Sequence, residues 1–414
     1  MSSPAAKKDA FAFIAPAEAC THCGYCLPVC PTYRADSNEV ESPRGRVSIL
    51  LALRDGHLGA KEAGAVLSHC LLCRACHAAC PAGVKPGHLV SLSRKHHPLP
   101  ANRLSRLFHA ITDHAGRSRA AAWCLGLYRR SGLRRPLRAL LRLFPALARL
   151  EGLVPDGPPA KVQTLPVPES GGWRIALIGS CMARLFYPAT HPAAFNLLVR
   201  LGHRPVSLVQ FGCCGAPHRE RGDWPALQRQ ATLLMRQLEG NGPFDAIVAD
   251  SDLCASTLKA YGHIFGKHNA SAGPAERMAK QVYTLSQFLA EAENWSDLPK
   301  ADPGLGRLAF HDHCQTRHGS GIINEPRSVL ATLPVALGDI PDGAFCCGAG
   351  GEYLLRHPER SRGVRELKIA AIRASGADTV VGANPGCLLN IEAGLREEGV
   401  RVMPLAEVLW RAIR

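Results

Sequence analysis

The chain has 414 residues, of which 49 are Lys or Arg and 34 are Asp or Glu, so its formal net charge is +15. At roughly 100–200 residues per domain, this length predicts two to four domains. With 46% hydrophobic and 20% charged residues, the composition excludes a collagen-like or wholly disordered chain. No apolar run is long enough to span a membrane, and the apolar stretch near the N-terminus is too short for a secretory signal, so we expect a cytoplasmic protein.

The chain contains 17 cysteines, an unusually large number. In a reducing compartment, thiols serve as metal ligands or redox groups more often than as a disulfide framework. An odd count also argues against complete internal pairing. A secreted disulfide-bonded protein is the alternative.

Two four-cysteine runs with the spacing of bacterial [4Fe-4S] ferredoxins, each followed by proline, lie in residues 1–100. They are Cys20, Cys23, Cys26, Cys30 and Pro31, and then Cys70, Cys73, Cys76, Cys80 and Pro81. In two-cluster ferredoxins, the fourth cysteine of each run ligates the other cluster. The predicted ligands are therefore Cys20, Cys23, Cys26 and Cys80 for cluster 1, and Cys70, Cys73, Cys76 and Cys30 for cluster 2. A pair of zinc sites is the alternative, because zinc also accepts four thiolates.

The 39 residues between the two runs are too many for the short connection of a small β-type ferredoxin. Within residues 44–64, apolar side chains recur with helical spacing at Val47, Leu50, Leu51, Leu53 and Leu58. We therefore expect an α-helical ferredoxin-like domain over residues 1–100.

Residues 101–170 form a basic helical segment and a proline-rich linker. The first fifty carry eleven arginines and one aspartate, together with Trp123, Tyr128 and Phe144. This composition suits peripheral contact with an anionic membrane, and contact with an acidic partner subunit is the alternative. No nucleic-acid-binding module is recognisable. Cys124, which lies outside every motif, is expected to be a buried apolar residue. Five prolines within 155–168 predict a stiff, extended connection.

A tandem duplication follows, over residues 171–300 and 301–414. Four cysteines of the first copy reappear in the second with the same offset of 133 residues: Cys181, Cys213, Cys214 and Cys254 correspond to Cys314, Cys346, Cys347 and Cys387. Each copy reads as strands alternating with helices, with first-copy strands expected at 174–178, 205–209 and 246–249 and a helix through 226–238. The cysteines then follow strand ends, which is the edge where open α/β sheets bind ligands. A 13-residue insertion in the first copy is expected as a polar loop around 262–280.

The expected fold class is thus α+β multidomain, with a helical ferredoxin-like domain before a duplicated α/β domain. Four soft sulfur ligands at one sheet edge suit an iron-sulfur cluster, zinc or a redox disulfide. Gly215 and Gly348, which follow the paired cysteines, would allow close approach of the backbone to a bound group.

Cys-Cys-Gly repeats of this length resemble those of heterodisulfide reductase catalytic subunits and of iron-sulfur subunits of respiratory dehydrogenases. The whole chain resembles the family of glycolate oxidase (glycolate dehydrogenase) iron-sulfur subunits. The matching strings begin at Cys20 (CTHCGYCLPVCPTY), Ser42 (SPRGR), Cys70 (CLLCRAC), Gly212 (GCCGA), Cys346 (CCGAGGEY) and Asn384 (NPGC).

This resemblance implies an electron-transfer subunit of an oxidoreductase complex, in which the isolated chain is only an electron carrier. Two [4Fe-4S] clusters would accept electrons from FAD-containing dehydrogenase subunits that oxidise glycolate or D-lactate, and would pass them toward quinone. FAD is expected on the partners only. The chain would be cytoplasmic, with a peripheral site on the cytoplasmic face of the inner membrane as a further option. The alternative is a heterodisulfide-reductase-like catalytic subunit acting on disulfide or sulfur substrates.

One departure concerns the repeats. The heterodisulfide reductase pattern closes each repeat with Cys-x-x-Cys, whereas this chain has Thr257 and Asn390 at the fourth position. Two possibilities stay open for the repeats. One is a metal-free structural relic. The other is ligation by the four cysteines of either repeat, which are Cys181, Cys213, Cys214 and Cys254 or Cys314, Cys346, Cys347 and Cys387.

Histidines accompany the Cys-Cys-Gly motifs: His311, His313 and His318 in the second repeat and His218 in the first. One of them could donate a proton or a hydrogen bond to a bound quinone. The simpler interpretation is a polar loop beside a metal site. The string that begins at Gly348, GAGGE, lacks the spacing of a dinucleotide-binding loop.

Overall fold

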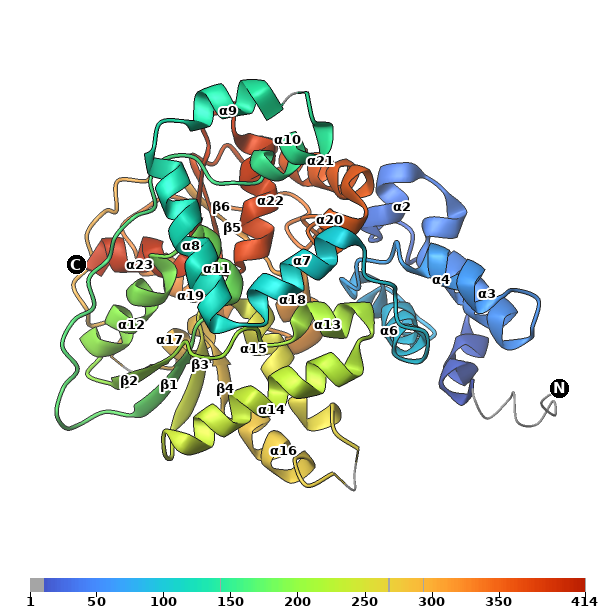
Figure 1. The fold of residues 1–414 in the computed structure, drawn as a ribbon, viewed down its shortest axis with the longest axis horizontal. Helices are drawn as coiled ribbons and strands as arrows, with labels where there is room; N and C mark the ends of the chain where they lie inside the picture. The colour runs from blue at the N-terminus through green and yellow to red at the C-terminus, as the bar shows by residue number, and fades with distance from the viewer. Residues whose placement is uncertain (1–10, 142, 267–268, 293, 414) are drawn as a thin grey trace.

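Two four-stranded parallel sheets, one from each repeat, organise most of the computed structural model (Figure 1). The structure describes residues 11–413 apart from 142, 267–268 and 293, so residues 1–10, where the expected domain begins, lie outside it. Figure 1 shows the N-terminal helices gathered on one side of the molecule and the strands toward the other. The fold class is α+β, as the sequence predicts.

The N-terminal region of the described chain is helical. Its elements are η1 (Ala12–Ala19), α2 (Pro31–Asp36), η2 (Glu39–Glu41), α3 (Pro43–Arg54), α4 (Ala60–Leu67), α5 (Ala75–Ala78) and α6 (Pro86–His96). The Ser42 hydroxyl accepts the Gly45 amide and Pro43 occupies the first turn, so α3 starts with both a cap and a fixed φ. Val47, Leu50 and Leu53 are buried against η1, α4 and α6. The predicted helical stretch is thus two helices, separated by the turn before Ala60.

Four helices carry the basic segment: α7 (Arg103–Thr112), α8 (Ala115–Arg130), α9 (Arg134–Leu141) and α10 (Pro145–Gly152). Helix α8 packs on the first repeat through the face that bears its one fully buried residue, Ser118. Trp123 and Cys124 lie on the opposite face, and both are exposed. The prediction that Cys124 is buried is therefore wrong, because the small residues of α8, rather than its larger apolar ones, face the protein.

The first repeat has the strand order β2-β1-β3-β4, with all pairs parallel. Its elements are β1 (Arg174–Ile178), α11 (Cys181–Phe186), α12 (Thr190–Arg200), β2 (Arg204–Leu208), α13 (Ala216–Arg221), α14 (Trp224–Gly240), β3 (Ala246–Ala249), α15 (Asp252–Lys259), η3 (Tyr261–His263), α16 (Ala272–Lys280), β4 (Val282–Thr284) and α17 (Leu285–Glu291). The inserted segment contains the helix α16, which buries Ala275 and Met278, so it is not simply a polar loop.

The second repeat has the equivalent order β6-β5-β7-β8. Its elements are β5 (Leu308–His311), α18 (Cys314–Ser320), α19 (Glu325–Ala331), β6 (Leu337–Gly338), α20 (Tyr353–Arg356), α21 (Pro358–Ser375), β7 (Thr379–Gly382), α22 (Pro385–Leu395), β8 (Arg401–Pro404) and α23 (Leu405–Ile413). In both sheets the first strand of the repeat lies between two other strands. Helices connect successive strands, and all paired strands are parallel.

The two repeats face each other with reciprocal contacts. Helix α11 touches α22 while its counterpart α18 touches α15, and α12 touches α23 while its counterpart α19 touches α17. Ile175 and Leu177 of β1 share one buried apolar cluster with Leu308 and Phe310 of β5. Each contact therefore occurs twice with the repeats exchanged, as in a two-fold dimer made from one chain.

The helical N-terminal region docks closely on the first repeat. The Leu99 amide donates to the Arg221 carbonyl at 3.0 Å, and the buried Arg94 guanidinium donates to the carbonyls of Glu220 at 2.8 Å and Cys70 at 2.6 Å. Gly222, which ends α13 with φ of 89°, lies against the Arg94 carbonyl, and a Cβ there would be 1.9 Å from that oxygen. Only glycine allows this approach.

Candidate metal centres and the shared cysteine cavity

The first cysteine cavity contains the four residues predicted for cluster 1. The cavity is lined by Cys20, Cys23, Cys26 and Cys80 together with Arg44. The Arg44 guanidinium donates to the His22 carbonyl at 2.8 Å. Cys23 is exposed and Cys20, Cys26 and Cys80 are half-buried. The structure therefore brings the last cysteine of the second motif to the first three of the first motif.

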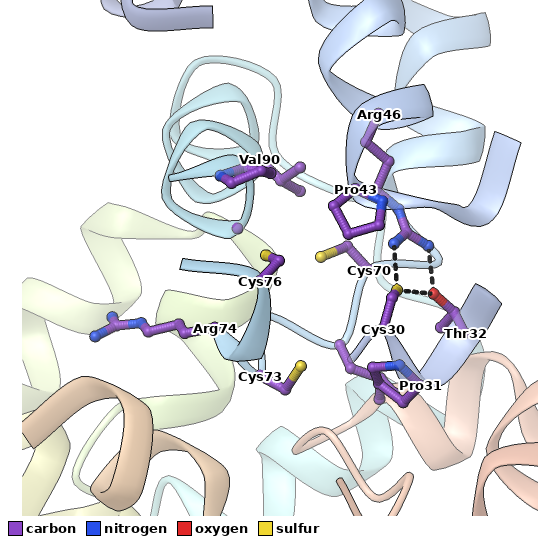
Figure 2. A pocket seen from close by; sticks show the side chains of 13 residues that line it. Cys30, Pro31, Thr32, Pro43, Arg46, Cys70, Cys73, Arg74, Cys76 and Val90 are labelled. Carbon is purple, nitrogen blue, oxygen red and sulfur yellow. Dashed lines mark hydrogen bonds between the residues drawn. The ribbon is translucent and has the colours of Figure 1, made fainter. Parts of the chain in front are cut away.

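The second cysteine cavity contains the four residues predicted for cluster 2, and Figure 2 shows their sulfurs pointing into one space. Cys30, Cys73 and Cys76 are buried, and Cys70 is half-buried. The Leu72 amide donates to the Cys70 sulfur at 3.4 Å. Burial, and then proximity to Cys314, raises the pKa of Cys73 well above its usual value. A thiolate here needs a compensating positive charge.

Arg46 is the buried cation beside this second cavity. Its guanidinium lies 3.8 Å from the Cys30 sulfur and donates to the Thr32 hydroxyl at 2.9 Å (Figure 2). It also donates to the Glu41 carboxylate at 2.9 Å. Burial disfavours its charge, but Cys70, Cys30 and Glu41 outweigh that effect and raise the pKa of Arg46. A permanent positive charge therefore faces the cysteines where anionic groups would be held.

The third cavity is lined by all eight repeat cysteines together. These are Cys181, Cys213, Cys214 and Cys254 from the first repeat, and Cys314, Cys346, Cys347 and Cys387 from the second. In each repeat one cysteine begins the helix after the first strand, the pair follows the second strand, and the last lies in the helix after the third strand. Because the two repeats face each other, both cysteine edges open into the same space.

In the first repeat the sulfurs form a contiguous series. The Cys181 sulfur lies 4.0 Å from that of Cys213, and contact with Cys181 and then Cys214 raises the pKa of Cys213. Hydrogen bonds from Cys213 and Cys254 lower the pKa of Cys214 well below its usual value. The Gly215 amide also donates to the Cys213 sulfur at 3.3 Å. This arrangement favours a thiolate at Cys214.

The three cavities adjoin one another. Pro86 lines both the first and the second, and Leu71 lines both the second and the third. Cys73 and Cys346 lie in one buried apolar cluster, with the half-buried Cys314 packed against it. The described structure therefore places the cysteines in a continuous row that runs from the N-terminal helices into the repeats.

These residues fit iron-sulfur clusters. All seventeen cysteines lie in the described part of the chain and are free thiols. Soft thiolates grouped in fours, with backbone amides donating to sulfur, are the donor set of such clusters.

Thr257 and Asn390 are buried beside the third cavity but do not line it in the described structure. The Thr257 hydroxyl donates to the Leu253 carbonyl at 2.8 Å, and the Asn390 amide donates to the Cys347 carbonyl at 2.8 Å. Asn390 therefore supports the backbone of the cysteine pair.

The four histidines do not share a polar loop, contrary to the simpler interpretation. His311 ends β5, His318 lies in α18 and His218 lies in α13. His313 lies just before α18 and lines the third cavity, and burial lowers its pKa to about 3. Its ring is therefore neutral near pH 7, which suits a hydrogen bond rather than donation from an imidazolium.

Glu220 is a cavity residue that the sequence did not reveal. It is buried in α13 and lines the third cavity, one carboxylate oxygen has no partner among the described residues, and burial raises its pKa to about 7. No motif marks it. Arg46, by contrast, lies in the SPRGR string that begins at Ser42, and this string is part of the family resemblance. The sequence therefore contains a motif that could have identified Arg46.

Family models match most of this arrangement. Residues 16–84 match the model of a 4Fe-4S dicluster domain, and residues 175–259 and 308–392 each match that of a cysteine-rich domain. None of the described helices is long and apolar enough to cross a membrane.

Several named proteins are similar in sequence. The chain is 32% identical to the probable glycolate oxidase iron-sulfur subunit of Bacillus subtilis (strain 168), over 95% of this chain and 93% of that protein. It is 28% identical to the glycolate oxidase iron-sulfur subunit of Escherichia coli (strain K12), over 91% of this chain and 90% of that protein. It is 31% identical to lactate utilization protein A of Geobacillus kaustophilus (strain HTA426), over 57% of this chain and 98% of that protein.

Proposed function

Since this chain belongs to the family of glycolate oxidase iron-sulfur subunits, we propose that it carries electrons from a flavin-bearing partner subunit toward a quinone. The partner would oxidise glycolate or D-lactate, in line with the names of the relatives. The observation that supports an electron path most strongly is the row of three adjoining cysteine cavities.

The proposed ligands follow the cavities. Cluster 1 would be held by Cys20, Cys23, Cys26 and Cys80, and cluster 2 by Cys70, Cys73, Cys76 and Cys30. A bound [4Fe-4S] cluster supplies reversible one-electron chemistry. The protein holds the thiolates close together, buries most of the second set, and places the Arg46 charge beside it. Exposure of Cys23 makes the first cavity the natural point of contact with a partner.

Peripheral contact with an anionic membrane on the cytoplasmic side is the second part of the proposal. Helices α8–α10 and the turns between them expose Trp123 (69%), Leu143 (73%) and Phe144 (54%) in a segment rich in arginine. Arg134 and Arg138 pair internally with Glu151, so only part of the charge is available for lipid. Exposed apolar and basic side chains in one segment suit a headgroup layer.

Vesicle binding tests this part. Sedimentation with phosphatidylglycerol vesicles at low salt should be strong, and should weaken for Trp123→Ser but not for Trp173→Ser, an exposed tryptophan outside the segment. No sedimentation at low salt would contradict membrane contact, and retention of an acidic dehydrogenase subunit by the same surface would identify a protein partner instead.

A reconstitution experiment tests the electron-transfer role. The chain and its flavoprotein partner, with glycolate or D-lactate, should reduce a quinone analogue, and Cys73→Ser should block that step while substrate still reduces the flavin. Equal quinone reduction without the chain, or none with either acid, would contradict the proposal. Reduction of a disulfide substrate by the chain alone would favour the heterodisulfide-reductase-like alternative.

A further inference from the structure

His311 is a buried imidazole whose ring nitrogens have no hydrogen-bond partner in the described structure. It ends β5 and is 2% exposed, and neither Nδ1 nor Nε2 is bonded to another described group. Burial lowers its pKa well below the usual value, so the ring is neutral. A buried polar group without a partner is costly, and native proteins seldom keep one without a use for it.

Two cysteine sulfurs lie next to this ring. A nitrogen of His311 and the sulfurs of Cys347 and Cys387 all lie within 4.8 Å of one another, and all three residues are buried. Around one tetrahedral metal ion, such ligand atoms are roughly 3.3–3.8 Å apart, as follows from metal–sulfur and metal–nitrogen bond lengths. Small rotations of these side chains would therefore suffice to bring the three atoms onto one ion.

The surroundings supply compensation for thiolates at this place. Lys368 is fully buried, and its amine donates to the Gly343 carbonyl at 3.1 Å. Burial lowers its pKa, while the nearby Cys347 and Cys346 act in the opposite direction. The Asn384 amide donates to the Cys387 sulfur at 3.1 Å. A buried cation and an amide donor beside two sulfurs are expected where the sulfurs carry negative charge.

The first repeat lacks these groups. With the offset of 133 residues, His311 corresponds to Ile178, Lys368 to Met235 and Asn384 to Ser251. Ile178 and Met235 are apolar core residues of the first repeat. The four cysteines are present in both copies, but at these three positions only the second copy has an imidazole, an amine and an amide. The cation that acts on Cys214 of the first copy is Arg219, which lies elsewhere in the repeat.

We propose that the second repeat holds a metal centre with mixed ligands, the His311 nitrogen and the thiolates of Cys347 and Cys387, and that the first repeat offers sulfur ligands only. We name Cys346, whose thiol interacts with that of Cys347, as the candidate for the fourth ligand; its sulfur is not one of the three atoms that lie within 4.8 Å of one another. Imidazole together with thiolates suits zinc or iron. The inference deepens the proposed function, on which it rests for the presence of metal in the repeats, but its test does not depend on electron transfer.

Metal analysis of the full chain tests the proposal. Iron, zinc and acid-labile sulfide per chain are measured for the wild type, His311→Ile, His311→Cys and Cys387→Ser. His311→Ile installs the residue of the first repeat and should lose metal to the same extent as Cys387→Ser, with retention after chelator treatment reduced about tenfold or more. His311→Cys keeps a ligand and should retain the metal. The control His318→Ala should match the wild type, because that ring bonds only the Ala344 carbonyl among described groups.

A cobalt(II) probe distinguishes the remaining outcomes. Cobalt bound to the metal-depleted chain should give a spectrum with fewer thiolate charge-transfer bands for the wild type than for His311→Cys, and this comparison decides the matter if His311→Ile does not fold. Full metal content in His311→Ile, or identical cobalt spectra, would overturn the proposal. A wild-type chain that contains the second-repeat metal but shows no ferredoxin-type electron paramagnetic resonance signals would contradict the proposed electron-transfer function. It would leave the mixed-ligand centre standing.

Discussion

The Ser251 hydroxyl donates to the Asn384 side-chain oxygen at 3.2 Å, although these two residues occupy the same position in the two repeats, 133 residues apart. Equivalent residues can touch only where a two-fold axis passes between them. Both line the third cavity. The axis of the duplicated domain therefore runs through the shared cysteine cavity.

This pair predicts unequal effects of two alanine substitutions. Ser251→Ala removes one buried hydrogen bond and should lower the free energy of unfolding by about 1 kcal/mol. Asn384→Ala also removes the donor to the Cys387 sulfur and should cost roughly twice as much. Urea unfolding of the anaerobically purified chain measures both. Equal losses would show that the bond between Asn384 and Cys387 contributes nothing to stability.

Arg46 should set the potential of the cluster proposed at the second cavity. Its charge lies beside Cys30 and favours the more negative, reduced state, so Arg46→Gln should lower the midpoint potential. A hydrogen bond to a charged group contributes about 1.5–3 kcal/mol, which corresponds to roughly 65–130 mV for one electron. A redox titration followed by electron paramagnetic resonance measures the shift.

Arg44 offers a matched control for this experiment. It lines the first cavity, is half-exposed, and pairs with Glu39. Arg44→Gln should therefore shift the cluster 1 signal less than Arg46→Gln shifts the cluster 2 signal. Shifts of the same size, or no shift for Arg46→Gln, would contradict a role for the buried charge.

A buried clamp joins α7 to both repeats. The His109 ring bonds the Glu352 carboxylate at 3.1 Å and stacks on the His218 ring, which bonds Asp113 at 3.0 Å. Burial alone would lower the pKa of His109, but hydrogen bonds to Asp113 and Glu352 outweigh it and raise that pKa. Despite burial, the same bonds hold the pKa of Asp113 and Glu352 below their usual values.

The clamp predicts a window of pH for its contribution to stability. A raised histidine pKa stabilises the fold below about pH 6.5, and this contribution is lost as pH rises through the raised value. The lowered carboxyl pKa values stabilise above about pH 4 and are lost as pH falls below it. The Tm difference between wild type and His109→Gln should therefore shrink from pH 6 to pH 9. The exposed residue His57 provides the control His57→Gln, whose Tm should follow the wild type throughout. A difference that grows toward pH 9 would contradict the charged clamp.

Gly222 predicts a large cost for a single methyl group. Gly222→Ala would force a Cβ to 1.9 Å from the Arg94 carbonyl at a positive φ, so the N-terminal helices and the first repeat could not keep their contact. We expect a loss of more than about 3 kcal/mol in unfolding free energy. Gly64→Ala, inside α4 with open space around it, should instead stabilise by about 0.5–1 kcal/mol. Similar effects of both substitutions would contradict the close docking.

The sequence predicted the repeat architecture well because its signals are local. Strands β1 and β3 occupy the predicted residues and β2 begins one residue earlier, since short apolar runs between polar turns define each of them. The cysteines of the N-terminal motifs meet in the predicted groups of four. Their spacing is a direct consequence of how the chain must wrap around a small cluster.

Relations between distant segments could not be predicted in this way. An offset of 133 residues reveals a duplication but contains no information on how the copies face each other, so the shared cavity appears only in the structure. The exposure of Cys124 depends on which face of α8 meets α11. Likewise, nothing local to Glu220 indicates that its carboxylate would be buried at the third cavity.

The electron-transfer function is tested best by the content of iron, zinc and acid-labile sulfide per chain in anaerobically purified protein. Two four-iron clusters in the N-terminal region require about eight irons with matching sulfide, and metal above that level belongs to the repeats. We expect at least about eight irons, reducible by the flavoprotein partner with glycolate or D-lactate. Little iron with abundant zinc that survives reconstitution would contradict an electron-transfer function.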